Sequence, residues 1–194
     1  ESGALWTANA RVLDGAGLDA IGKGGFSLGA RAQQIRDSLL SLDRATIDDM
    51  LSIQLDDRSP LHQRWRDLLL SALNEGTVAG NRQRAELRSE ALQWDGRADP
   101  DTAGYRLARD FRRQVSDELL SSIVSACGSF EDAVTLQRRN QSEGPIWRLV
   151  TEQPDNLLPA NYQSWQQFFL AAADRTIASC DQSSLSQCTW GEIN

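Results

Sequence analysis

An asparagine and an arginine near the start of the chain have side chains that could do chemistry together. Asn9 lies in a predicted strand, and Arg31 lies 22 positions later at a predicted helix start. An amide N–H group steadied by a guanidinium is a suitable donor to a developing oxyanion. With 7 asparagines and 19 arginines in 194 residues, a pair at any one separation is expected about 0.7 times by chance. The surrounding sequence must therefore support the pair.

Length and composition predict a soluble globular protein, or a trimmed piece of an exported one. The chain of 194 residues fits one domain, or one domain and a piece of another, and its 40% hydrophobic and 24% charged residues are ordinary values. No apolar run approaches the roughly 20 residues that cross a bilayer, and the first residues do not resemble a signal peptide. The net charge of −7 argues against nucleic acid as the main partner, since phosphate binding needs a basic surface.

The three cysteines leave one question open. Cys180 and Cys188 flank a polar stretch that is short enough to close as a disulfide loop in an oxidising compartment, so a bridge and two free thiols are both compatible with the sequence. Cys127 lies on the apolar face of a predicted helix and is expected to be a small buried core residue. Zinc is not expected, because the two C-terminal cysteines lack metal-type spacing and His62, the only histidine, is distant in sequence.

The chain is predicted to be mainly helical, with seven to eight helices and a short N-terminal β segment. Seven of the 14 glycines fall in the first 29 residues, which read as a strand over 4–8, extendable to 12, and a glycine-rich loop over 15–25. Periodic apolar residues after Gly29 predict helices near 28–42, 46–55, 60–75, 81–94, 108–127, 129–134 and 162–177. A lone strand cannot form a sheet, so this segment is expected to join strands outside the chain.

Two helix starts carry specific signals. Thr46 with Asp49 three residues later resembles a capping box. Ser59 followed by Pro60 is the preferred order at a helix start, and the expected buried stripe then comprises Leu61, Trp65, Leu68 and Ala72, ending at Gly76. The tryptophans lie on such stripes or at helix ends, which favours core packing over base stacking.

Several possible catalytic motifs are rejected. Gly25-Phe26-Ser27-Leu28-Gly29 has the letters of a hydrolase nucleophile elbow, but neither the preceding strand nor a series of βαβ units is present. Gly22-Lys23-Gly24-Gly25 lacks the serine or threonine of a phosphate loop. His62 has no evident partner and is interpreted as a surface or half-buried structural residue. The pair Asp48-Asp49 fits a helix start, and Asp56-Asp57 is expected to be solvated.

Three segments taken in order resemble the penicillin amidase (penicillin acylase) family. They are Trp6 to Val12, Gly29 to Ile35, and Ile47 to Asp56, the last of which carries the pattern DM-x-x-IQ-x-D in residues 49–56. The resemblance implies a β-subunit fragment. Residues 1–28 would supply a core strand and loop of an αββα N-terminal-nucleophile hydrolase, and residues 29–194 would form a helical, knob-like domain.

The resemblance also implies roles for the opening pair. In this family a precursor cleaves itself to expose an N-terminal serine whose α-amine is the general base. Asn9 matches the asparagine of the oxyanion hole, and Arg31 matches the arginine that orients it. Glu1 is not a nucleophile and Ser2 does not carry the free α-amine, so the isolated chain is expected to be inactive. No cofactor is required, although Asp19 lies near the place where some relatives bind calcium.

The remaining expectations follow from the same resemblance. The partners would be the other α- and β-subunit segments of the precursor and a small acyl amide substrate, without nucleic acid or membrane. The location would be periplasmic or secreted. An acyl-homoserine-lactone acylase of the same family is the nearest alternative, and a non-catalytic helical interaction domain is the alternative from another class.

Overall fold

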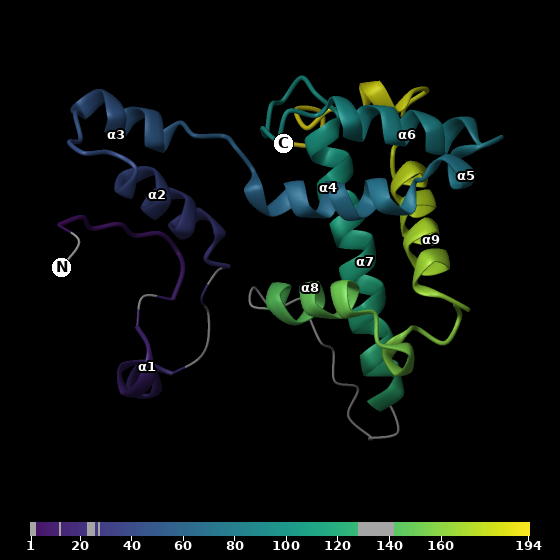
Figure 1. The fold of residues 1–194 in the computed structure, drawn as a ribbon, viewed down its shortest axis with the longest axis horizontal. Helices are drawn as coiled ribbons and strands as arrows, with labels where there is room; N and C mark the ends of the chain where they lie inside the picture. Colours follow the sequence, from purple (N-terminus) through teal and green to yellow (C-terminus); the bar gives the residue numbers. More distant parts are fainter. Residues whose placement is uncertain (1–2, 12, 23–25, 27, 128–141) are drawn as a thin grey trace. The chain divides into compact units, whose positions relative to one another are not determined.

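A computed structural model describes residues 3–11, 13–22, 26, 28–127 and 142–194. These ranges contain nine α-helices, two short 3-10 helices and no β-strand, so the protein is mainly helical and its expected N-terminal β segment is not confirmed. The helices are α1 (Gly15–Ile21), α2 (Ala30–Leu40), α3 (Ile47–Gln54), α4 (Pro60–Ala72), α5 (Glu75–Val78), α6 (Arg82–Gln93), α7 (Gly104–Cys127), α8 (Glu143–Glu152), η1 (Asp155–Leu157), α9 (Trp165–Ala178) and η2 (Leu185–Gln187). Figure 1 shows their order along the chain.

The chain divides into two compact units. Unit 1 comprises residues 1–56 and 139–144, and unit 2 comprises residues 57–138 and 145–194. The boundary between 56 and 57 places α2 and α3 with the N-terminal segment. The sequence predicts a different division, in which residues 1–28 belong to a catalytic core and residues 29–194 to a knob-like domain. The two compact units do not test that assignment, so it stays a prediction.

The described residues of unit 1 show helix caps and polar contacts, with little full burial. Thr46 and Asp49 form the predicted capping box, in which each side chain accepts from the other residue's backbone N–H. The glycine-rich loop was predicted without regular structure, but residues 15–21 form α1. Leu18 is the buried apolar residue of this unit among those described, whereas Leu5, Ile47 and Leu55 are 98%, 87% and 71% exposed.

Unit 2 has a continuous apolar core centred on α7. The face of α7 that carries Leu107, Phe111, Val115 and Leu119 is fully buried. Helices α4, α6 and α9 pack against it, as Figure 1 shows. The 3.6-residue period brings these side chains onto one face, and burial of each one stabilises the fold by about 1.5–3 kcal/mol.

The core differs in detail from the predicted stripes. In α4 the buried side chains include Trp65, Leu69 and Ala72. Leu68, which was expected to be buried, is only partly buried against the core. Gly76 does not end this helix, because α4 ends at Ala72 and Gly76 lies in α5. Helix α8 was not predicted, yet its Ile146 and Val150 join the core. The predicted stop at Gly128 and the helix near 129–134 lie outside the described residues, as does the side chain of Cys127.

A disulfide loop packs against α6. Cys180 and Cys188 are bridged, with their Cα atoms 5.9 Å apart, which answers the question that the sequence left open. The carboxylate of Glu86 accepts from the Ser184 hydroxyl at 2.5 Å and from the Leu185 backbone N–H at 2.8 Å. These hydrogen bonds, led by the one from Ser184, hold the pKa of Glu86 below its usual value.

Truncation of a buried α4 side chain should destabilise unit 2. Leu69 is 0% exposed, so we expect Leu69→Ala to lower the free energy of unfolding by about 2–5 kcal/mol through lost burial and a residual cavity. Urea unfolding followed by circular dichroism measures the change. Leu92→Ala is the matched control, because Leu92 is 54% exposed on α6; equal losses in the two variants would contradict the assigned core.

The Glu86 contact should make stability depend on pH. A carboxyl whose pKa is lowered in the folded state contributes stability above its unfolded pKa, here about 4.5, and loses it as pH falls through the lower folded value. We therefore expect the stability advantage of the native chain over Glu86→Gln to be present at neutral pH and to shrink in acid below pH 4.5. Urea unfolding midpoints measured from neutral to acid pH test this, and parallel curves would contradict it.

Candidate functional site

Arg31 lies in the first turn of α2 and binds the end of α3, the helix beside it in unit 1 (Figure 1). Its Nη1 donates to the carbonyl of Asp56 at 2.8 Å, and its Nη2 donates to the carbonyls of Ile53 and Gln54 at 3.2 and 3.1 Å. The last carbonyls of a helix have no partner within it, and the negative end of the helix dipole favours a cation there. The guanidinium thus caps α3 and is fixed by it.

The end of α3 also receives a second side chain from α2. Gln34 Nε2 donates to the carboxylate of Asp56 at 2.6 Å. In unit 2, Arg97 forms an ion pair with Asp57. Asp57 is exposed, as predicted, and it also pairs with Arg97. Asp56 is half-buried and accepts from Gln34, so it is not simply solvated. The pair Asp48-Asp49 does lie in the first turn of α3, as predicted.

Asn9 is exposed, and the next residue, Ala10, lies beside Gly29 at the start of α2. A Cβ built on Gly29 would lie 3.9 Å from the Cβ of Ala10. The residue after Asn9 is thus beside a residue two positions before Arg31. Among the described residues no hydrogen bond joins the Asn9 amide to the Arg31 guanidinium, so the shared oxyanion role stays a prediction.

Asp19, the candidate calcium ligand, is exposed in α1. Within the described ranges no group of three or more histidine, cysteine, aspartate or glutamate residues could hold a metal ion. A calcium ion at Asp19 would therefore need other oxygen ligands. In the same ranges, no helix has both the length and the apolar character needed to cross a membrane.

His62 has a partner that the sequence analysis missed. Ser59 Oγ lies 2.7 Å from His62 Nδ1, across the first turn of α4. His62 is 9% exposed, more buried than predicted, and its ring meets that of Tyr105 edge-on at 5.2 Å between centroids. A serine at the N-cap three residues before the histidine was the available signal. The ring contact between His62 and Tyr105 packs the first turn of α4 against α7.

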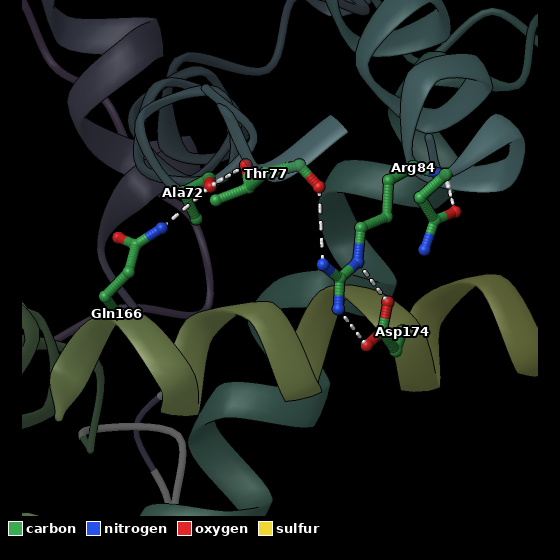
Figure 2. A network of polar contacts seen from close by, with 6 residues as sticks. Ala72, Thr77, Arg84, Gln166 and Asp174 are labelled. Atoms are coloured by element: carbon green, nitrogen blue, oxygen red, sulfur yellow. Dashed lines mark hydrogen bonds and ion pairs between the residues drawn. The ribbon is translucent and has the colours of Figure 1, made fainter. Parts of the chain in front are cut away.

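A polar network in unit 2 was also missed. Arg84 donates through Nε and Nη2 to the two carboxylate oxygens of Asp174, at 2.8 and 2.6 Å, and through Nη1 to the carbonyl of Thr77. Figure 2 shows how Thr77 and Gln166 in turn donate to the carbonyl of Ala72. The hydrogen bond to Asp174 raises the pKa of the Arg84 guanidinium. The network joins α4, α5, α6 and α9 and has the geometry of a structural clamp.

A pocket in unit 2 lies between α7 and the segment around η1. Glu118, Ser121, Asn156 and Asn161 contribute to its wall. The Glu118 carboxylate accepts from the Tyr162 hydroxyl at 3.1 Å and pairs with Arg175 at 3.1 Å. Its charge is thus already compensated within the fold, and we assign no chemistry to this pocket.

Removal of the Arg31 guanidinium should loosen α3. We expect Arg31→Ala to lower the opening free energy of the α3 amides by about 1–3 kcal/mol, because the carbonyls at its end lose a charged donor. Hydrogen–deuterium exchange of α3 measures this change. Arg36→Ala is the control, because Arg36 lies on the same helix and bonds to its exposed neighbour Asp37. Equal exchange in the native chain and in Arg31→Ala would show that the contact does not hold α3.

Comparison with known proteins confirms the family resemblance. A family described as penicillin amidase matches residues 1–194, the whole chain. A comparison with curated proteins finds no match. The matched range includes both the segment around Asn9 and the α2–α3 contact, as well as all of unit 2. The chain therefore belongs to the penicillin amidase family, a family of hydrolases with an amidohydrolase-type function.

Proposed function

We propose that this chain is a β-subunit segment of an amidase that hydrolyses a linear acyl amide through an N-terminal serine outside the chain. The observation that carries this proposal is the placement of Arg31. Its guanidinium binds the end of α3, and the helix that bears it begins beside Ala10. The segments that resemble the family thus meet around the two residues with predicted roles in the oxyanion site.

The chemistry is acyl transfer in two stages. The serine hydroxyl attacks the amide carbon while its proton passes to the α-amine of the same residue, which gives a tetrahedral intermediate with a negative oxygen. That intermediate collapses as the leaving amine takes the proton, and water then releases the acyl group from the serine. In this scheme Asn9 Nδ2 donates to the oxyanion, a contribution worth about 10²–10³ in kcat in other hydrolases.

Arg31 would act on Asn9 rather than on the substrate. Its hydrogen bonds to α3 use both terminal nitrogens. They leave the Nε–H group for another acceptor, and the amide oxygen of Asn9 is a suitable one. A donor held there would orient the Asn9 amide so that its N–H faces the carbonyl of the substrate.

The two units would have different tasks. Leu5, in residues 1–28, is largely exposed, as expected of a segment that completes a larger catalytic core. Residues 1–28 would belong to that core, and residues 29–194 would form the knob-like domain, whose apolar core lies in unit 2. The partners would be the other segments of the same precursor.

The proposal includes a compartment and a maturation step. A zymogen that cleaves itself would release the N-terminal serine, in the periplasm or outside the cell. The bridge between Cys180 and Cys188 supports an oxidising compartment. Calcium bound in part by Asp19 remains a proposal for the assembled protein, and no cofactor is required for the chemistry.

Substitution of Asn9 in the assembled, processed amidase should reduce turnover. We expect Asn9→Ala and the near-isosteric Asn9→Asp each to lower kcat about 10²–10³-fold with a smaller change in KM, because both lack the amide N–H. Release of the amine from chromogenic acyl amides and from an acyl-homoserine lactone measures this and separates the two acylase types.

Thr7→Ala is the matched control, because Thr7 is an exposed neighbour on the same segment. It should retain turnover within about three-fold. Full activity in Asn9→Asp would show that the Asn9 amide does not donate to the oxyanion. Absence of hydrolysis by the unsubstituted amidase would instead favour the helical interaction domain.

A further inference from the structure

We propose that Gln34 and Asp56 are positioning residues for Arg31, acting through the contact between α2 and α3. This inference rests on the proposed function, because it assigns the two residues to the same oxyanion site. It also gives a role to the last residue of the DM-x-x-IQ-x-D pattern, which the proposed chemistry leaves unused.

Both α2 side chains bind the same residue at the end of α3. Arg31 and Gln34 are three positions apart and therefore lie on one face of the helix. Arg31 Nη1 donates to the main-chain carbonyl of Asp56 at 2.8 Å, and Gln34 Nε2 donates to its carboxylate at 2.6 Å. Asp56 thus receives one bond on its backbone and a charge-assisted one on its side chain.

Polar side chains of α2 bind the end of α3. Neither helix has a fully buried residue. Asp56 lies beyond the α3 C-cap, Leu55, so the helix itself does not fix it. Gln34 supplies that fixation from α2. The bond between Gln34 and Asp56 therefore helps to place the Asp56 carbonyl, one of the three that orient the guanidinium.

Precision matters at this site more than strength. A donor that stabilises a transition state works only when it is held in place before the reaction, and a displacement of about 1 Å can reduce the rate about 10²-fold. Arginine has a long side chain with several rotatable bonds. The carbonyls of Ile53 and Gln54 in α3 and the carbonyl of Asp56 beyond it restrict that freedom, so the Nε–H group keeps one direction.

An exchange of donor and acceptor tests the inference in the processed amidase. Gln34→Glu replaces the amide donor by a second carboxylate of nearly the same shape, which repels Asp56. We expect kcat to fall about ten-fold or more, with KM changed less than about three-fold. Asp56→Asn in the Gln34→Glu background restores one donor and one acceptor, and it should recover kcat to within about three-fold of the unsubstituted enzyme.

The matched control is Gln33→Glu, which makes the same change on an exposed neighbouring position of α2. It should leave kcat within about two-fold. If it lowers kcat as much as Gln34→Glu does, added charge on α2 is the cause and the inference fails. If Asp56→Asn does not rescue Gln34→Glu, the inference fails as well.

A double-mutant cycle tests whether the effect passes through Arg31. In an Arg31→Lys background, Gln34→Glu should lower kcat by less than about two-fold further, because the group that it positions is already lost. Full additivity of the two effects would overturn the positioning role.

The outcome separates this inference from the proposed function. If the unsubstituted protein hydrolyses no acyl amide, the proposed function fails, and the contact is judged by hydrogen exchange at the end of α3. Faster exchange in Gln34→Glu that Asp56→Asn reverses would support the positioning contact, and unchanged exchange would overturn it.

Discussion

Carbonyl groups at the end of a helix have no partners within it, and in α3 this constraint is met by one guanidinium from another helix. With little apolar burial available, the caps and the polar contacts between α2 and α3 determine where Arg31 lies. The same bonds that satisfy the helix end also orient the side chain that the family resemblance assigns to the oxyanion site, so stability and positioning have one physical cause.

Unit 2 is stabilised by a different kind of interaction. Its core is apolar and built around α7, and the polar clamp of Arg84 and Asp174 ties α6 to α9 at its edge. Buried area of this kind tolerates change at the surface, whereas a guanidinium held by three carbonyls does not. Under the proposed function, only the segment that carries Arg31 would need atoms fixed to within a fraction of an ångström.

The sequence was most informative where the cause of a structure is local. The capping box of Thr46 and Asp49 and the start of α4 at Pro60 depend on residues at most four positions apart, and both were predicted. The periodicity of α7 was equally visible. The Arg84 clamp spans 90 positions and the bonds of Arg31 to α3 span 22 to 25, and no local pattern reports such pairs. The oxyanion roles predicted for Asn9 and Arg31 came from a family resemblance. The contact with α3 that fixes Arg31 was found only in the structure.

An experimental structure of the processed amidase with a phosphonate analogue of the tetrahedral intermediate would test the central claim most directly. The measurement is the distance from Asn9 Nδ2 to the phosphonate oxygen that represents the oxyanion. We expect about 2.7–3.1 Å, with Arg31 still bound to the end of α3 and its Nε directed at the Asn9 amide oxygen. An Asn9 amide beyond hydrogen-bonding distance, or a guanidinium that has left the α3 carbonyls, would contradict the account.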